Sequence, residues 1–372
     1  MRITIERASF LKSLSHVQSV VERRNTIPIL SNVLLKADKS TLSLTATDLD
    51  IEVSESVGAD VVRAGATTAA AHTLFDIVRK LPEGSQVQLD FGEADGKLTL
   101  SAGRSRFQLQ ALPKEDFPAM TTGAFPNKFS LSTRELISLI DKTRFAVSTE
   151  ETRYYLNGIF LHSATEKGKV LLKAVATDGH RLARFELPAP KGASELSGVI
   201  IPRKTINELR KLLEDSETNV DVSLSDTKIR FQLGSLTLTS KLIDGTFPEY
   251  QRVIPTGNDK ALEVVRDELK DAVDRVSTVS SEKSRAVRLN LEKGKLTLSV
   301  VSPEAGTATE ELVIDYKHAP IEIGFNARYI MDILERIDGS KAMFLFSDAG
   351  SPTLVRECDG DAALYVLMPM RV

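Results

Sequence analysis

The feature that most constrains this chain is an internal repeat with a step close to 130 residues. Phe117-Pro118 is followed 130 residues later by Phe247-Pro248, and Ala46-Thr47-Asp48 by Ala176-Thr177-Asp178. Self-similarity at a fixed step indicates a repeated architecture, in which copies of one unit pack against their neighbours. A chain of 372 residues has room for three such units, each large enough to bury its own core.

Each unit is predicted to contain two amphipathic helices and several half-buried strands. Stretches such as Thr41–Thr47 and Lys97–Ser101 alternate apolar and polar residues with period two. Apolar residues at helical spacing mark a first and a second helix in each unit. The anchors are Phe10, Leu136 and Leu269 for the first helices, and Leu74, Ile206 and Ile330 for the second. The sequence therefore predicts an α+β chain of three similar domains, each with two helices packed on antiparallel sheets.

The predicted domains are joined by segments rich in turn-forming residues. Pro113–Asn127 and Asp244–Asn258 contain several prolines and glycines, which are typical of turns and linkers. We accordingly expect domains over residues 1–121, 128–247 and 255–372.

Composition excludes several classes of protein. The net charge of −3 shows no global basic excess, although a local basic surface remains compatible with it. The single cysteine, Cys358, rules out an intramolecular disulfide and suits a reducing compartment. Met1–Ile5 is interpreted as a strand and not as a signal peptide, and no apolar run approaches membrane-spanning length. A cytoplasmic protein without a membrane partner is expected.

The predicted helices carry basic residues on their polar sides. One interpretation is sorted charge, with positive helices facing a polyanion and binding phosphates independently of sequence. The alternative is that each helix simply has a solvated face. The basic residues are Lys12, Arg23, Arg24, Arg79, Lys80, Arg134, Lys142, Arg144, Arg203, Lys204, Arg210, Lys211, Arg266, Lys270, Arg275, Arg328 and Arg336.

Motifs of catalysis and cofactor binding are missing. The chain has no GxxxxGK[ST] loop and no GxGxxG after a strand, and its five histidines lack zinc-site spacing. Asp48-Leu49-Asp50 is interpreted as a pair of surface carboxylates at a strand end. We expect no catalytic residue, no cofactor and no metal, which favours a scaffold or binding role.

Five separated segments carry a resemblance to a known family. They are Arg153–Gly158, Ala176–Leu182, Phe247–Val253, Ile323–Asn326 and Met368–Arg371. With Ile27–Asn32, they closely resemble the bacterial DNA polymerase III beta subunit family of sliding clamps along the whole chain. The resemblance implies a non-enzymatic processivity factor. Two three-domain chains would pair head to tail into a closed ring, helices inside, around double-stranded DNA.

The resemblance also implies a pocket that binds short peptides between the second and third domains. Its partners would be the alpha subunit of DNA polymerase III, the clamp loader delta subunit, other polymerases and repair proteins. Adaptable methionines suit several partners, Gly179 would let a peptide approach, and Arg181 and Arg252 would frame the rim. The matching residues are Leu156, Thr177, Gly179, His180, Arg181, Leu182, Pro248, Arg252, Val253, Val366, Met368, Pro369, Met370 and Arg371.

Two further sets of residues follow from the resemblance. Arg24, Arg153, Tyr154 and Tyr155 would contact DNA, while Glu150 departs from the family pattern, because a carboxylate repels phosphate. The seam between two chains would join Arg104, Arg106 and Phe107 of the first domain to Glu304, Glu310 and Glu311 of the third.

Two alternatives stay open at this stage. The first is a DNA-modifying enzyme that embraces its substrate with three domains. The second is a peptide-binding scaffold without a nucleic-acid role.

Overall fold

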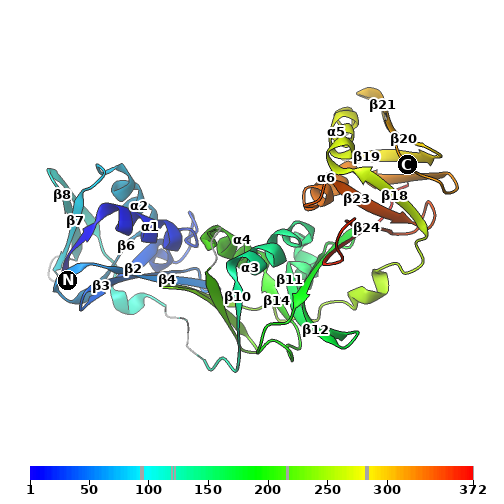
Figure 1. The fold of residues 1–372 in the computed structure, drawn as a ribbon. Helices are drawn as coiled ribbons and strands as arrows, with labels where there is room; N and C mark the ends of the chain where they lie inside the picture. The colour runs from blue at the N-terminus through cyan, green and yellow to red at the C-terminus, as the bar shows by residue number, and fades with distance from the viewer. Residues whose placement is uncertain (93–95, 119, 121–122, 215–217, 281–284, 372) are drawn as a thin grey trace. The chain divides into compact units, whose positions relative to one another are not determined.

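The computed structural model describes residues 1–92, 96–118, 120, 123–214, 218–280 and 285–371. The chain forms two compact units, Met1–Arg134 with Asn207–Leu242, and Glu135–Ile206 with Ile243–Val372. The predicted middle domain is divided between them, because its strands join two different sheets (Figure 1).

The first unit holds two antiparallel sheets. The smaller sheet has the order β5 (Asp60–Arg63), β1 (Arg2–Glu6), β7 (Gln86–Gly92), β8 (Lys97–Ala102), β9 (Ser105–Gln110). The larger sheet has the order β10 (Asn127–Ser132), β15 (Asn219–Leu224), β16 (Lys228–Leu233), β17 (Leu236–Lys241), β4 (Ile51–Gly58), β3 (Thr41–Thr47), β2 (Asn32–Asp38), β6 (Gly65–Ala70).

Helices α1 (Arg7–Gln18) and α2 (Ala71–Lys80) pack against each other in this unit (Figure 1). The Glu6 side chain caps α1 by accepting a hydrogen bond of 2.7 Å from Ser9 N. Helix α1 stops at Gln18, and Val20 and Val21 are buried in the turn that follows it. The described part of this unit also contains two short 3₁₀ helices, η1 (Pro28–Ser31) and η2 (Lys114–Asp116).

The second unit also holds two antiparallel sheets. The larger has the order β14 (Val199–Pro202), β11 (Gly158–Glu166), β12 (Lys169–Thr177), β13 (Arg181–Pro188), β25 (Ala363–Leu367), β24 (Thr353–Glu357), β23 (Lys341–Phe346), β18 (Lys260–Val265). The smaller has the order β21 (Gly306–Val313), β20 (Lys295–Ser302), β19 (Ala286–Glu292), β22 (Ile321–Asn326).

Helices α5 (Arg266–Ser277) and α6 (Ala327–Leu334) form the corresponding helix pair (Figure 1). Three short helices lie in the connections of the same unit. They are η3 (Arg144–Ala146), η4 (Glu151–Leu156) and η5 (Tyr250–Val253). The two helices of the middle domain, α3 (Thr133–Asp141) and α4 (Arg203–Leu212), each begin in one unit and end in the other.

Two hairpin turns that correspond in the sequence repeat have the same hydrogen bonds. Thr47 Oγ1 accepts a hydrogen bond from Leu49 N and donates to Ile51 O. Thr177 Oγ1 accepts from Gly179 N and donates to Arg181 O in the same way. Leu49 and Gly179 both have positive φ, 79° and 88°. The prediction of an α+β chain of similar domains is confirmed.

The interpretation that the helices carry exposed basic faces is wrong in two places. Helix α5 carries four carboxylates against three bases, and Arg275 is held by Glu310 on β21 at 2.6 Å. Lys142 is only 8 % exposed and binds Asp338 and Glu357 at 2.7 and 2.9 Å, so it lies on no solvated face. Ion pairing with side chains distant in sequence removes these cations from the surface charge.

Candidate peptide-binding site

A compact apolar cluster lies in the second unit where the larger sheet meets the segment before β18. We call it the apolar cluster. Its buried members come from η4, β12, β13, the start of β14, the segment around η5, and β25. They are Leu156, Val175, Leu182, Ile200, Phe247, Tyr250 and Val366. The half-buried side chains of Tyr155, Phe160, Ile243, Ile254, Leu354 and Leu364 pack against it.

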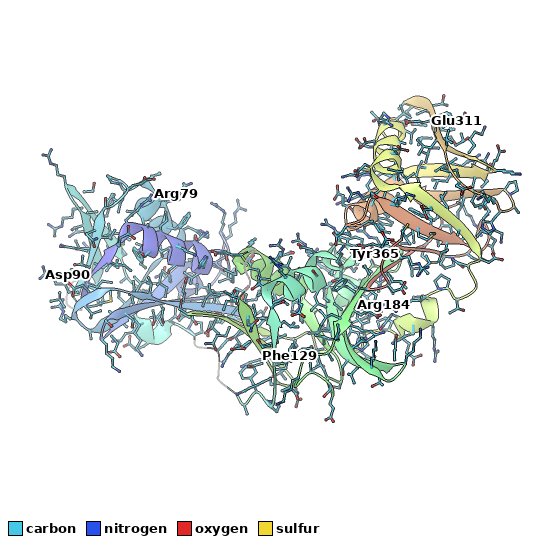
Figure 2. The ribbon with its side chains drawn as sticks, in the orientation of Figure 1. Arg79, Asp90, Phe129, Arg184, Glu311 and Tyr365 are labelled. Atoms are coloured by element: carbon cyan, nitrogen blue, oxygen red, sulfur yellow. The ribbon has the colours of Figure 1, made fainter. Side chains whose placement is uncertain are left out.

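Strand pairing creates this cluster. The antiparallel pair β13–β25 sets Leu182 opposite Val366, with Ala183 opposite Tyr365 one position further along. Arg184 on β13 and Tyr365 on β25 can be located in Figure 2. Because side chains alternate between the two faces of a sheet, Leu182 and Val366 point to the same side and join Leu156 and Tyr250 there.

Exposed apolar side chains follow the same segments beyond the buried cluster. Val253 of η5 is 51 % exposed and Met368, directly after β25, is 39 % exposed. Met368 N donates to His180 O at 2.9 Å, and Met370 N donates to Gly324 O at 2.8 Å, so the chain end is tied down. An exposed apolar rim beside a buried apolar floor is typical of a site that receives an apolar peptide side chain.

The structure places the predicted pocket residues within one unit. Leu156, Leu182 and Val366 belong to the apolar cluster, and the others lie in three segments. Thr177, Gly179 and His180 form the hairpin turn before β13. Pro248, Arg252 and Val253 lie at η5, and Met368, Pro369, Met370 and Arg371 follow β25.

Arg181 does not frame the rim as the sequence suggested. It is 8 % exposed, its Nε binds Asp178 at 3.1 Å, and its Nη2 donates to Phe145 O at 2.6 Å. Asp332 of α6 takes the remaining nitrogen, and the Tyr329 ring lies 4.2 Å from the guanidinium carbon. Arg181 therefore anchors the hairpin turn to α6, whereas the side chain of Arg252 is 81 % exposed.

The backbone conformation of the turn is a second reason for glycine at position 179, in addition to the predicted approach of a peptide. Its φ of +88° belongs to the left-handed region, and a Cβ there would lie 2.7 Å from Arg153 Nη1. Asp178 completes the turn by accepting from His180 N and Arg181 N at 2.9 and 3.0 Å. The positive φ and the position of the Arg153 side chain thus favour glycine whether or not a peptide approaches, although Leu49 has a similar φ in the equivalent turn of the first domain.

Sequence reasoning missed several members of the cluster. Phe247 and Tyr250 lie inside the Phe247–Val253 segment that carried the resemblance, so their position next to Pro248 was an available signal. Val175 and Ile200 had no such signal. They are ordinary strand residues until β12 and β14 bring them to the same face.

The predicted DNA-contacting residues are found in two different units. Arg24 is exposed in the segment after α1. In the second unit, the Arg153 guanidinium binds the Glu150 carboxylate at 2.7 and 2.8 Å. Tyr154 is an exposed side chain, whereas Tyr155 packs against the apolar cluster. Tyr155 thus borders the apolar cluster, next in the chain to the exposed Tyr154.

The predicted seam residues occupy two sheet edges. Arg106 and Phe107 lie on β9 and Arg104 in the hairpin before it, while Glu310 and Glu311 lie on β21 and Glu304 in the turn before it. Glu310 binds Arg275, and Glu311 binds Lys295 at 3.2 Å. Both strands end their sheets among the strands that the structure describes.

Comparison with known proteins decides the family. Models of the DNA polymerase III beta subunit match in three consecutive parts: the N-terminal domain at residues 1–121, the central domain at 130–249 and the C-terminal domain at 251–371. The chain belongs to the DNA polymerase III beta subunit family.

Individual relatives agree over their full length. The beta sliding clamp of Caulobacter vibrioides is 55 % identical over 372 residues, and that of Escherichia coli K12 is 38 % identical over 374, each covering 100 % of both chains. A crystal structure of the Caulobacter crescentus clamp has a TM-score of 0.98 at 55 % identity, covering 100 % of this chain and 99 % of the other. The Bartonella birtlesii clamp bound to griselimycin has a TM-score of 0.97 at 51 % identity, covering 100 % of both chains.

Neither a metal-binding cluster nor a membrane-spanning helix is found among the residues that the structure describes. No group of three or more His, Cys, Asp or Glu side chains among the described residues could hold a metal ion. Within the same residues, no helix is long and apolar enough to cross a membrane.

Proposed function

We propose that this chain is a DNA polymerase processivity factor, a sliding clamp that encircles duplex DNA and tethers DNA polymerase III to it. The supporting observation is the match to the beta subunit family along the full length. The clamp is a non-catalytic subunit, and it holds its partner on DNA by topology, so its phosphate contacts can stay weak enough to permit sliding.

The strand pairing supports a ring made from two chains. The last strand of the second domain, β17, pairs with β4 of the first, and the last strand of the third, β25, pairs with β13 of the second. The last strand of the first domain is β9, and the third-domain counterpart of β4 and β13 is β21. We infer that β9 of one chain pairs with β21 of another, a head-to-tail contact that closes a ring when its rotation allows.

The charges on these two strands fit such a contact. Arg104, Arg106 and Phe107 of one chain would face Glu304, Glu310 and Glu311 of the next. Opposite charge across the seam favours head-to-tail pairing over contact between like edges. The position of Phe107 in its hairpin corresponds to that of Leu238 in β17, which is buried against β4. Phe107 would supply the apolar part of the same contact.

The apolar cluster and its exposed rim are proposed to bind short peptides of partner proteins. These partners are the alpha subunit of DNA polymerase III, the clamp loader delta subunit, other polymerases and repair proteins. Met368 and Met370 repack easily, which suits one site shared by several sequences. Because the similar Bartonella birtlesii clamp binds griselimycin, we propose that griselimycin also binds this chain.

Arg24, Arg153, Tyr154 and Tyr155 are proposed to contact DNA without reading its sequence, because arginine and tyrosine side chains bind phosphate and sugar groups. We further propose domain limits of 1–121, 128–247 and 255–372, and a cytoplasmic location.

The ring is tested on plasmid DNA. The chain is loaded onto a nicked circular plasmid with its clamp loader and ATP, and bound protein is separated by gel filtration. A ring stays with the circle and runs off within minutes after the plasmid is cut once. Equal loss from circular and linear DNA would contradict a topological link, and the chain would then be a peptide-binding scaffold or a conventional DNA-binding protein.

The peptide site is tested separately by fluorescence anisotropy. The probe is a histidine-free peptide from the alpha subunit that carries a rhodamine label, whose emission does not depend on pH in the neutral range. It is called the probe peptide below, and griselimycin is the competitor. Saturable binding at pH 7.5 that griselimycin displaces supports the site. Absence of binding would refute it while leaving the ring untouched.

A further inference from the structure

A buried histidine supports the peptide site from behind. His162 lies on β11 and is 7 % exposed. Its Nδ1 is 3.1 Å from Ser163 O, and its Nε2 is 3.0 Å from the Tyr250 hydroxyl. A carbonyl oxygen only accepts, so Nδ1 carries the proton and Nε2 is the acceptor. The Tyr250 hydroxyl therefore donates to His162.

The same imidazole begins a stack of three rings. His162 stacks on Phe160 with ring centroids 4.8 Å apart, and Phe160 stacks on Phe247, also at 4.8 Å and with the two planes 4° apart. Gly198 lies against this stack, where a Cβ would come within 2.6 Å of the Phe160 ring. His162 thus contacts Tyr250 directly and is connected to Phe247 through the Phe160 ring.

Charged groups surround this histidine on the neighbouring strands. Lys173 of β12 is its cross-strand partner and is 1 % exposed. Lys173 binds Glu166 of β11 and Glu186 of β13, and Arg184 of β13 binds Glu186 at 3.3 Å. The two cations and two carboxylates are paired with one another, so these four side chains carry no net charge beside His162.

We propose that His162 is a positioning residue for the peptide site: neutral, it holds Tyr250 and Phe247 in the arrangement that receives the peptide, and protonated, it releases them. The inference rests on the proposed peptide-binding function and adds to it a residue that is buried behind the apolar cluster. It makes binding sensitive to proton concentration through a group behind the cluster.

The chemistry of release follows from the hydrogen bonds. A second proton on the ring turns Nε2 into a donor, so it can no longer accept from Tyr250, and the hydroxyl has to rotate its own hydrogen away and meet a charged donor in place of a neutral acceptor. Burial raises the pKa of Tyr250 to about 12, which keeps its proton on the oxygen throughout the neutral range. The protonated ring would also be a buried cation beside Lys173.

Burial lowers the pKa of His162 below its ordinary value of 6.5, and the Lys173 cation acts in the same direction. The neutral ring is therefore the form that the fold favours. The stability that the neutral ring gives to the folded arrangement is fully present above pH 6.5. It is lost as the pH falls below that value through the lowered pKa of His162. Peptide affinity should follow the same course.

The test measures the affinity of the probe peptide between pH 5.5 and 8.0. In His162→Gln the amide oxygen can still accept from Tyr250 but nothing titrates, so affinity at pH 7.5 stays within about twofold and the profile flattens. His162→Leu leaves a buried hydroxyl without its acceptor, and we expect about tenfold weaker binding. In a Tyr250→Phe background, His162→Leu should add no further loss.

His180→Gln is the matched control, since His180 is an exposed histidine of the proposed site. Whatever its affinity, it should retain the decline below pH 6.5. The proposal is overturned if His162→Gln keeps the profile of the unmodified protein, or if His180→Gln alone abolishes it. Should His162→Leu prove unfolded by thermal denaturation, the glutamine profile still decides. Failure of the unmodified protein to bind at pH 7.5 would refute the peptide site itself.

Discussion

Leu182 of β13 stands opposite Val366 of β25, and both side chains are buried in the apolar cluster. One strand belongs to the second domain and the other to the third. The floor of the proposed peptide site therefore exists only where these two domains share a sheet. A change that separated β13 from β25 would remove the site without altering any exposed residue around it.

Met368 is the cleanest exposed contact to remove. Its side chain is partly exposed, so Met368→Ala should leave thermal stability unchanged. The same substitution should lower the affinity for the probe peptide about tenfold, which is about 1.4 kcal/mol. Anisotropy titration measures the affinity, and Val62→Ala, an exposed valine on β5 in the other unit, is the control. Equal affinities of the two variants would remove Met368 from the site.

Deletion of Met368 to Val372 is a harsher form of the same experiment. It should abolish peptide binding and leave the dimer intact, because β9 and β21 lie elsewhere in the chain. The deletion also removes the bond from Met370 N to Gly324 O, so its effect on stability has to be measured beside the point substitution.

Alanine substitutions of Arg181 and Arg252 should have very different effects on the free energy of unfolding, although both residues were predicted to frame the rim of the site. Arg181→Ala removes the buried guanidinium that pairs with Asp178 and Asp332, which should cost about 3–5 kcal/mol in the free energy of unfolding. Arg252→Ala removes an exposed pair with Glu249 and should change that free energy by no more than about 0.5 kcal/mol. Urea denaturation compares the two, and similar losses would show that Arg181 does not anchor the turn.

Glu150 is expected to weaken DNA binding in two ways. It repels phosphate, and it holds the Arg153 guanidinium in an ion pair. Glu150→Gln should therefore strengthen binding of duplex DNA by about two- to fivefold at low salt and make the salt dependence steeper.

Glu249→Gln offers a matched control, since Glu249 forms the same i,i+3 pair with Arg252. DNA affinity should not change in that variant beyond the small effect of one net charge. If both glutamine variants gain equally, the effect is one of overall charge and Arg153 has no special role.

The seam between two chains is tested by reversing charge on β9. Arg104→Glu together with Arg106→Glu sets acidic residues against the carboxylates of β21, and the dimer should dissociate at concentrations at least tenfold higher. Sedimentation analysis gives the dissociation constant. The control Lys97→Glu, on the neighbouring strand β8, should change this dissociation constant by no more than about twofold. A dimer that survives the double reversal would place the seam elsewhere.

Local sequence predicted the elements of this fold closely. The alternation of Thr41–Thr47 matches β3 residue for residue, and Leu74, Ile206 and Ile330 all lie in helices at equivalent places. Such patterns succeed because they depend on residues within a few positions of one another, whose side chains must share one face of a helix or strand. The family resemblance supplied the residues of the proposed site, which spacing alone did not distinguish from core.

Charge partners were beyond the reach of the sequence. Arg181 meets Asp332 across 151 positions, and Lys142 meets Glu357 across 215. Both cations were assigned to exposed faces, because an isolated basic residue is normally solvated. Their burial follows from the packing of the second and third domains.

The sequence by itself determined that one unit is written three times, with its helices, strands and connecting segments, because periodicity is a local property of the chain. Only the tertiary structure decided which side chains form the apolar cluster, which cations are neutralised, and that His162 lies behind Tyr250 and Phe247. Those relationships join strands far apart in the chain, and they are fixed by sheet register and close packing, which no short stretch of residues encodes.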